Sequence, residues 1–423
     1  MNSSSLVYTN LQDLIVSEQI NRDKSLKVMS FILKLESPQT YGTPSIYMMT
    51  RPRGFGLSLL TSATDKIIRR EKDIVSKIED EGLLKELPCR HTVCLDFKNF
   101  KAKTPKDFKR GLIDVLQELF WFHHIESHFD TYMTPKVYFT RLLESLYKRH
   151  QESMAIIIDN YDKPLMVAAM MADKEKATDA TCTYLDMLNV IRHTDKAVRW
   201  CLLTGHTKFA LASEYSEGLP LVEDLSSDPS FESMFGFTKE EVKIVFKNQI
   251  DKFAKAKEMT AETYLNILDK CYGGFCFSDN LVKVMCPASI SHLMQNQGLL
   301  YPYSASGNYT FLKYALKHKN NDLSWLYGKD GQDPLFISSV DKSLEGKQLG
   351  SLLIQLGFAT SSKVLVNNDE GYTTWRYRFD FPNLDMRKTF DIITGKCDQE
   401  EANIPLSFEQ AESLGEKNER SFF

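Results

Sequence analysis

The stretch TRPRGFGLSLL, residues 50–60, decides the fold because it joins an apolar run to a helical pattern. The run SIYMMT at 45–50 has the composition of a buried strand, and apolar residues recur at intervals of three and four from Ser58 onward. Glycines between a strand and a helix are typical of a loop whose backbone N–H groups hold a phosphate. The stretch therefore predicts a phosphate-binding turn.

The loop lacks part of the chemistry that such a turn requires. A working P-loop follows G-x-x-x-x-G-K-[ST], in which the lysine contacts the β/γ-phosphates and the hydroxyl holds Mg²⁺. Here Gly56 and Ser58 are present, whereas Arg51 replaces the first glycine and Leu57 replaces the lysine. Residual phosphate contact is one interpretation, and an empty structural turn is the other. The loop residues that we predict to contact a nucleotide are Arg51, Arg53, Gly54, Gly56, Leu57 and Ser58.

Apolar segments alternate with helical patterns along the first half of the chain. The segments lie at 45–50, 91–97, 154–160 and 198–205. This alternation predicts an α/β fold, a P-loop NTPase-like parallel sheet with helices on both faces. Ligands bind such sheets at the carboxyl ends of the strands, so 51–58, 159–162 and 204–208 should lie together.

Two of these strand ends carry residues suited to nucleotide chemistry. In AIIIDNYDKP, Asp159 ends a strand as a Mg²⁺ ligand of Walker B type would. Asn160 follows it where an active ATPase often has glutamate, and an amide cannot accept a proton from water. Thr204 ends the next strand, where it could sense the γ-phosphate. We therefore predict Asp159, Asn160 and Thr204 as a degenerate catalytic set.

Three further assignments are open at this stage. Ser58, Asp159 and Asp162 form a candidate Mg²⁺ site, although Asp162 could instead have a structural capping role beside Lys163. Lys208 is a candidate substitute for the missing cation, or else a salt-bridged lysine. The implied cofactors, if any is bound, are ATP and Mg²⁺.

The sequence changes character after residue 235. GFTKEEVKIVFKNQIDKFAKA contains a threonine followed by acids and an amphipathic run, a typical helix start. A second helical run stops at Gly273–Gly274. We expect an N-terminal segment at 1–19, an α/β domain at 20–235, a helical lid and accessory region at 236–395, and an acidic polar tail at 396–423.

Composition limits the classes of function. The 423-residue chain has a net charge of −4, so no overall basic field favours nucleic acid or an anionic membrane. No apolar run is long enough to span a bilayer, and the start resembles no secretory signal. The eight cysteines are dispersed, which favours reduced thiols. These features predict a cytoplasmic protein.

Several stretches occur in the order of a known family. They are NRDKSL (21–26), RPRGFGLSL (51–59), LDFK (95–98), IDNYDKP (158–164), LTGHTKFA (203–210), FGFTKEEV (235–242), CYGGFCFS (271–278), CPASI (286–290) and GFATS…FPNLDMR (357–387). Together they resemble the bacterial AAA-ATPase-like family, with its YVDKS, RPRRFGKSL, LDFS, IDEYDKP, LTGVSKFS, CGFTEEEL, WYDGYRFS, NPWSI and GYLT…FPNEEVR. That family often carries a C-terminal PD-(D/E)XK nuclease-like domain, which we do not expect here.

The departures from this pattern concern its chemistry. Leu57 replaces the loop lysine, Gly54 the second loop arginine, and Asn160 the Walker B glutamate. The resemblance therefore implies a degenerate AAA-ATPase-like protein, inactive or a weak ATPase, that works as a scaffold by binding an unidentified protein partner. One alternative is a slow ATPase that uses Arg51 or Arg53 in place of the lysine. Another is a nucleic-acid-associated remnant of a mobile-element protein, which the charge does not favour.

The end of the chain allows two interpretations. EQAESLGEKNER, residues 409–420, resembles the glutamate-containing C-terminal export signals of bacterial type IV effectors. That resemblance implies export into a host cell. The other interpretation is an acidic, solvated tail.

Overall fold

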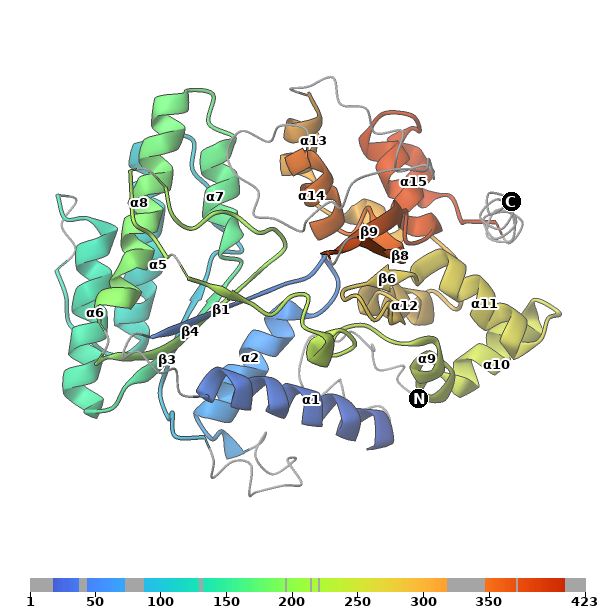
Figure 1. Cartoon of the computed structure of the whole chain (residues 1–423), viewed down its shortest axis with the longest axis horizontal. Helices are drawn as coiled ribbons and strands as arrows, with labels where there is room; N and C mark the ends of the chain where they lie inside the picture. The colour runs from blue at the N-terminus through green and yellow to red at the C-terminus, as the bar shows by residue number, and fades with distance from the viewer. Residues whose placement is uncertain are drawn as a thin grey trace.

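Figure 1 shows the computed structural model of the chain. The structure describes residues 18–37, 44–72, 87–128, 132–194, 196–213, 215–219, 221–317, 347–369 and 372–407. Residues 409–420, where a tail signal was predicted, lie outside these ranges. No helix within them is long and apolar enough to cross a membrane.

A five-stranded parallel sheet forms the centre of the first region. Its strands are β1 (Ser45–Thr50), β2 (Thr92–Asp96), β3 (Met154–Asp159), β4 (Val198–Gly205) and β5 (Glu223–Asp224). The order is β2-β3-β4-β1-β5, and every neighbouring pair is parallel. Asp96 pairs in register with Asp159, and Thr50 pairs with Gly205. The carboxyl ends of β1–β4 therefore meet at one edge, as the alternating pattern predicted.

Helices cover both faces of this sheet (Figure 1). One face has α1 (Glu18–Glu36) and α2 (Leu57–Ile68). The other has α5 (Pro105–Phe122), α6 (Pro135–His150), α7 (Asp162–Ala169) and α8 (Lys174–His193). Thr104 and Thr134 cap α5 and α6 through their side chains and precede prolines at the first helical turn, a favourable start signal. Both faces are buried, so all six residues of β1 and of β3 are buried.

The second region is mainly helical. Its α-helices are α9 (Lys239–Val245), α10 (Lys247–Ala256), α11 (Ala261–Tyr272), α12 (Pro287–Gln295), α13 (Thr310–Lys317), α14 (Lys347–Gln355) and α15 (Leu384–Ile393), and its 3-10 turns include η2 (Pro229–Phe231), η3 (Tyr303–Ser306) and η5 (Gln399–Asn403). Thr238 and Glu241 form a reciprocal capping box at α9, which confirms the predicted helix start. The helix α11 ends at Tyr272, immediately before Gly273, as predicted.

Two antiparallel hairpins, which the sequence did not predict, also occur in this mostly helical region. The strand β6 (Phe275–Cys276) pairs with β7 (Lys283–Val284), and β8 (Thr360–Asp369) pairs with β9 (Tyr372–Asp380). Part of the predicted polar tail is also packed. The backbone N–H of Leu406 donates to the carbonyl of Leu300 at 2.7 Å, and its side chain is buried.

The two regions share one hydrophobic core. Buried side chains of β1–β4 form a continuous cluster with Phe275, Leu312, Phe358 and Phe390 of the second region. A separate cluster lies among α9, α10, α11 and α12. The second region is therefore packed against the sheet domain, and it contacts the edge at which a ligand would bind.

Candidate functional site

The turn between β1 and α2 has the backbone geometry of a phosphate loop. Gly54 and Gly56 have φ values of +86° and +80°, a left-handed conformation that favours glycine. Gly56 is the N-cap of α2, and no side chain caps that helix. In the described part of the chain, no side chain therefore accepts hydrogen bonds from the first N–H groups of α2, and such a helix start is suited to binding an anion.

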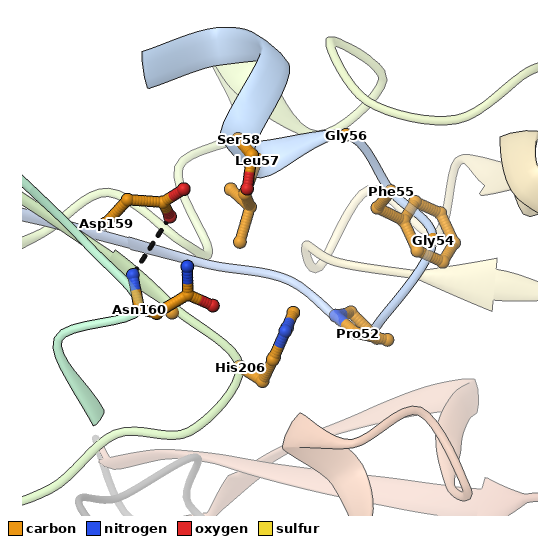
Figure 2. A pocket seen from close by; sticks show the side chains of 10 residues that line it. Pro52, Gly54, Phe55, Gly56, Leu57, Ser58, Asp159, Asn160 and His206 are labelled. Atoms are coloured by element: carbon orange, nitrogen blue, oxygen red, sulfur yellow. Dashed lines mark hydrogen bonds between the residues drawn. The ribbon is translucent and has the colours of Figure 1, made fainter. Parts of the chain in front are cut away.

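This turn forms one wall of a small cavity (Figure 2). The cavity has a volume of about 130 Å³, whereas pockets that bury a whole small-molecule ligand usually measure roughly 300–1,000 Å³. Its size therefore suits a phosphate group. The lining residues are Pro52, Gly54, Phe55, Gly56, Leu57, Ser58, Asp159, Asn160, Gly205 and His206.

Asp159 is the acidic group of the cavity. Its Oδ1 accepts hydrogen bonds from the Asn160 N–H at 2.9 Å and from the Thr204 hydroxyl at 2.7 Å. Burial raises the pKa of Asp159, while hydrogen bonds from Ser58 and Thr204 act in the opposite direction. Thr204 is fully buried and does not line the cavity. Its observed role is to orient Asp159, and contact with a γ-phosphate stays a prediction.

Asn160 has an unusual backbone that fits its residue type. Its φ is +55°, a left-handed conformation that asparagine adopts more readily than most residues. The Nδ2 amide donates to Asp96 Oδ1 at 2.9 Å, across the pairing of β2 with β3. Asn160 can therefore orient a water through its amide, but it offers no base. Sequence inspection did not identify Asp96 as its partner.

Arg51 does not line the cavity, and its predicted contact with phosphate stays a prediction. Its guanidinium is buried and donates to the carbonyls of Thr50 at 2.9 Å and Ser226 at 2.6 Å. A third bond runs to the carbonyl of Phe231 at 3.3 Å, and the charge lies 4.3 Å from the Phe277 ring centroid. Burial lowers the pKa of Arg51 to about 9. This side chain holds the segment after β5 against β1.

Lys208 and Asp162 are also occupied by structural partners. The Lys208 ammonium pairs with Asp224, and its backbone N–H donates to Gln355 Oε1 at 2.7 Å. Asp162 Oδ2 accepts from the backbone N–H groups of His206 and Thr207, both at 2.8 Å. Neither residue lines the cavity. Other segments of the chain engage both side chains, and the contacts of Lys208 with phosphate and of Asp162 with Mg²⁺ stay predictions.

The remaining predicted loop residues divide into two groups. Gly54, Gly56, Leu57 and Ser58 line the cavity, and the isobutyl group of Leu57 stands where a P-loop lysine would. Arg53 is exposed, so it is the loop arginine whose side chain is accessible to a ligand.

His206 is a cavity residue that our sequence analysis missed. Its ring Nδ1 lies 3.0 Å from the Arg51 carbonyl oxygen. The available signal was its position, immediately after Gly205, which ends β4.

The cavity residues fit Mg²⁺ better than they fit a triphosphate. The Ser58 hydroxyl and the second carboxylate oxygen of Asp159 are hard oxygen donors, and Figure 2 shows that oxygen on the side facing Ser58. Such an ion would neutralise phosphate charge. Within the described ranges, no cavity-lining residue is lysine or arginine, and no cluster of three or more metal-ligating side chains occurs.

The second region contacts the loop between β1 and α2. The Ala288 N–H at the start of α12 donates to the Gly54 carbonyl at 3.2 Å. Phe55 packs edge-on against Phe275 and Phe277, with ring centroids 4.9 and 5.1 Å away. The contacts with the loop therefore come from β6, from Phe277 beyond it and from α12, whereas α9 packs within the second cluster.

The first region of the chain is similar to a family of known proteins. Residues 13–213 match a family model described as a predicted AAA-ATPase. An uncharacterized protein in the vnfD 5′ region of Azotobacter chroococcum mcd 1 is 21% identical over 351 residues, which cover 82% of this chain. The matched part is 62% of that relative, so this chain spans less than two thirds of its length.

A solved structure gives a weaker likeness. The Aeropyrum pernix ORC1 protein in complex with DNA aligns with a TM-score of 0.30 and 11% identity, over 88% of this chain and 92% of that chain. The family match covers β1–β4, the phosphate loop and the cavity. Over residues 13–213 this chain is similar to the predicted AAA-ATPase family.

Proposed function

We propose that this chain is a degenerate AAA-ATPase-like protein that does not hydrolyse ATP efficiently and acts as a scaffold for another macromolecule. The observation that carries the first part is the cavity itself. Leu57 lines it where a lysine is needed, and Asn160 stands where a base is needed. Arg51 and Lys208 are held by Ser226 and Asp224 and cannot replace the lysine without breaking these contacts.

The expected loss of rate is large. Removing one preorganised electrostatic contact from a transition state typically costs about 10²–10³ in kcat. A neutral isobutyl group supplies no such contact to the β/γ-phosphates. The absence of a general base beside Asp159 slows activation of the attacking water as well. Oxygen donors for Mg²⁺ are retained, so weak binding of ATP·Mg remains compatible with the geometry.

Turnover of the full chain tests this proposal. Phosphate release from ATP·Mg should be the same for the wild type and for Asp159→Asn, which removes the charged Mg²⁺ donor. Asp159→Asn keeps the side-chain size and its oxygen acceptor for Thr204, and so serves as a matched background control. A wild-type rate about a hundredfold or more above that of Asp159→Asn would refute the pseudo-enzyme assignment.

One observation favours the alternative of a slow ATPase. Arg53 is exposed on the loop, between Pro52 and Gly54, which both line the cavity. It is therefore the loop cation that could turn toward a phosphate. If the wild type shows turnover, this alternative requires Arg53→Met to abolish it.

Exposed aromatic side chains support the scaffold role. Trp121 and Phe122 at the end of α5 are 81% and 54% exposed. Tryptophan is enriched among the residues that dominate binding energy at protein interfaces. We expect Trp121→Ser with Phe122→Ser to lose a partner that the wild type retains from a bacterial cytoplasmic extract. Identical sets of retained proteins would contradict a scaffold surface at this position.

A further inference from the structure

The His206 ring is held with one nitrogen fixed and the other free to meet a ligand. Its backbone N–H donates to Asp162 Oδ2 at 2.8 Å, which fixes the start of the segment after β4. The ring Nδ1 lies 3.0 Å from the Arg51 carbonyl oxygen, and a carbonyl can only accept, so Nδ1 carries the hydrogen. Among the described residues, no hydrogen bond or ion pair involves Nε2 of this ring.

The ring enters the cavity opposite Leu57. Both residues line the cavity, and Figure 2 shows the His206 ring and the Leu57 side chain pointing toward one another. The uncapped start of α2 lies on the Leu57 side. A group bound between the two walls would therefore meet backbone N–H groups on one side and an imidazole on the other.

Two cations lie near Lys163, outside the lining of the cavity. Burial lowers the pKa of Lys163, the charges of Arg53 and Lys101 lower it further, and the charge of Asp162 raises it. An anion bound beside Lys163 would reduce the repulsion that it meets from Arg53 and Lys101.

Leu57 and His206 differ in what they can offer a ligand. Leu57 is uncharged and apolar, whereas His206 carries an imidazole. Both residues line the same cavity, and none of the described residues that line it is lysine or arginine. The cavity thus has an imidazole on the wall opposite Leu57.

We propose that His206 contacts a phosphate group in this cavity and supplies the donor and the charge that Leu57 cannot. An imidazole that donates from both ring nitrogens is an imidazolium, so a phosphate oxygen bound at Nε2 meets a positive charge. The ligand class is inorganic phosphate or the terminal phosphates of a nucleotide. This inference rests on the proposed function, because it describes residual binding at a site without efficient hydrolysis.

Two isosteric substitutions separate the phosphate contact from the structural contact. Asn places an amide donor near the position of Nδ1 and so keeps the bond to the Arg51 carbonyl, whereas Gln places a donor near Nε2. In calorimetric titrations with inorganic phosphate and with ATP·Mg, His206→Asn should bind roughly tenfold to a hundredfold more weakly than the wild type. His206→Gln should retain part of the affinity. Thermal unfolding of each variant verifies the fold.

A double-mutant cycle with Leu57→Lys makes the test specific. If lysine and histidine serve the same phosphate, His206→Asn should weaken binding much less in the Leu57→Lys background than in the wild type. An equal effect in both backgrounds would assign His206 a merely structural role and overturn the inference. So would unchanged affinity in His206→Asn, or no binding by the wild type. Phosphate release, measured separately, decides the proposed function whatever these titrations show.

The two ligands distinguish the source of the phosphate. Histidine-dependent binding of inorganic phosphate alone would assign the cavity to a free phosphate. Histidine-dependent binding of ATP·Mg alone would assign it to a nucleotide, and either result supports the contact.

Discussion

At the scale of single residues, Arg51 shows how a residue of the phosphate-loop pattern can serve the fold. Its guanidinium donates to carbonyls of Ser226 and Phe231, which lie more than 170 positions along the chain. A buried carbonyl that loses its donor costs free energy comparable to a lost hydrogen bond. Arg51 therefore stabilises the contact between β1 and the segment that follows β5.

Substitution of the two loop arginines should separate stability from ligand contact. Arg51→Met removes the donors of three buried carbonyls, so we expect the free energy of unfolding to fall by at least about 2–4 kcal/mol. Arg53→Met changes an exposed side chain and should stay within about 0.5 kcal/mol. Urea denaturation of both variants provides the measurement. Equal, small losses would show that the Arg51 contacts do not stabilise the fold.

At the scale of elements, the loop between β1 and α2 depends on its contact with the second region. A Cβ on Gly54 would lie 2.8 Å from Cys286 Sγ and 2.9 Å from Ala288 Cβ. A Cβ on Gly56 would meet nothing nearer than Leu59 Cβ at 4.0 Å. The two glycines have similar positive φ values. A difference in stability between variants at the two positions therefore reports the contact of Gly54 with α12.

Gly54→Ala should therefore destabilise the protein more than Gly56→Ala. Both variants place an alanine at positive φ, which costs on the order of 1 kcal/mol. Gly54→Ala adds a steric clash with Cys286 and Ala288, and we expect it to lose roughly 1–3 kcal/mol more. Chemical denaturation measures the difference. Indistinguishable losses would mean that α12 does not hold the loop in solution.

A buried carboxylate joins three elements of the second region. Asp385 in α15 accepts from the Ser304 N–H at 3.0 Å, the Ser304 hydroxyl at 2.8 Å and the Ser289 hydroxyl at 3.2 Å. Burial raises the pKa of Asp385 to about 6, although these hydrogen bonds act in the opposite direction. The folded state thus holds a proton here more tightly than the unfolded chain, whose aspartate pKa is near 3.9.

Stability should therefore rise as pH falls through about 6, because the folded state gains a proton that the unfolded state does not. This contribution grows until the unfolded aspartate also protonates near pH 4, and it reaches about 3 kcal/mol from the two-unit difference. Asp385→Asn should remove it. We expect the difference in unfolding free energy between wild type and Asp385→Asn to change between pH 7.5 and pH 5. A constant difference would contradict the raised pKa.

At the scale of the whole molecule, the sequence predicted the elements that depend on local pattern. The apolar runs of β1–β4 and their alternation with helices were enough to place Ser58, Asp159 and Asn160 at one sheet edge, because parallel strands end together. The strand β5 was not predicted, since it has two polar residues and forms only by pairing with β1. The hairpin β8–β9 likewise depends on pairing between two segments.

The directions of the long side chains could not be predicted from the sequence either, because they also depend on contacts with distant segments. Arg51 and Lys208 follow strand ends, as predicted, but their partners Ser226 and Asp224 come from the segment around β5. A lysine or arginine side chain that reaches a buried carbonyl or carboxylate forms a charge-assisted hydrogen bond with it, and this bond fixes the direction of the side chain. Leu57 lines the cavity, which its place at the start of α2 made predictable, and its contact with a nucleotide stays a prediction.

The affinity of the full chain for ATP·Mg, with and without a cation at position 57, tests the central claim most directly. Isothermal titration should give a wild-type Kd of about 1 mM or weaker, and Leu57→Lys should tighten it roughly tenfold to a hundredfold by restoring a charge-assisted contact. Leu57→Met, of similar volume and no charge, should match the wild type. Micromolar wild-type binding that Leu57→Lys leaves unchanged would contradict the account.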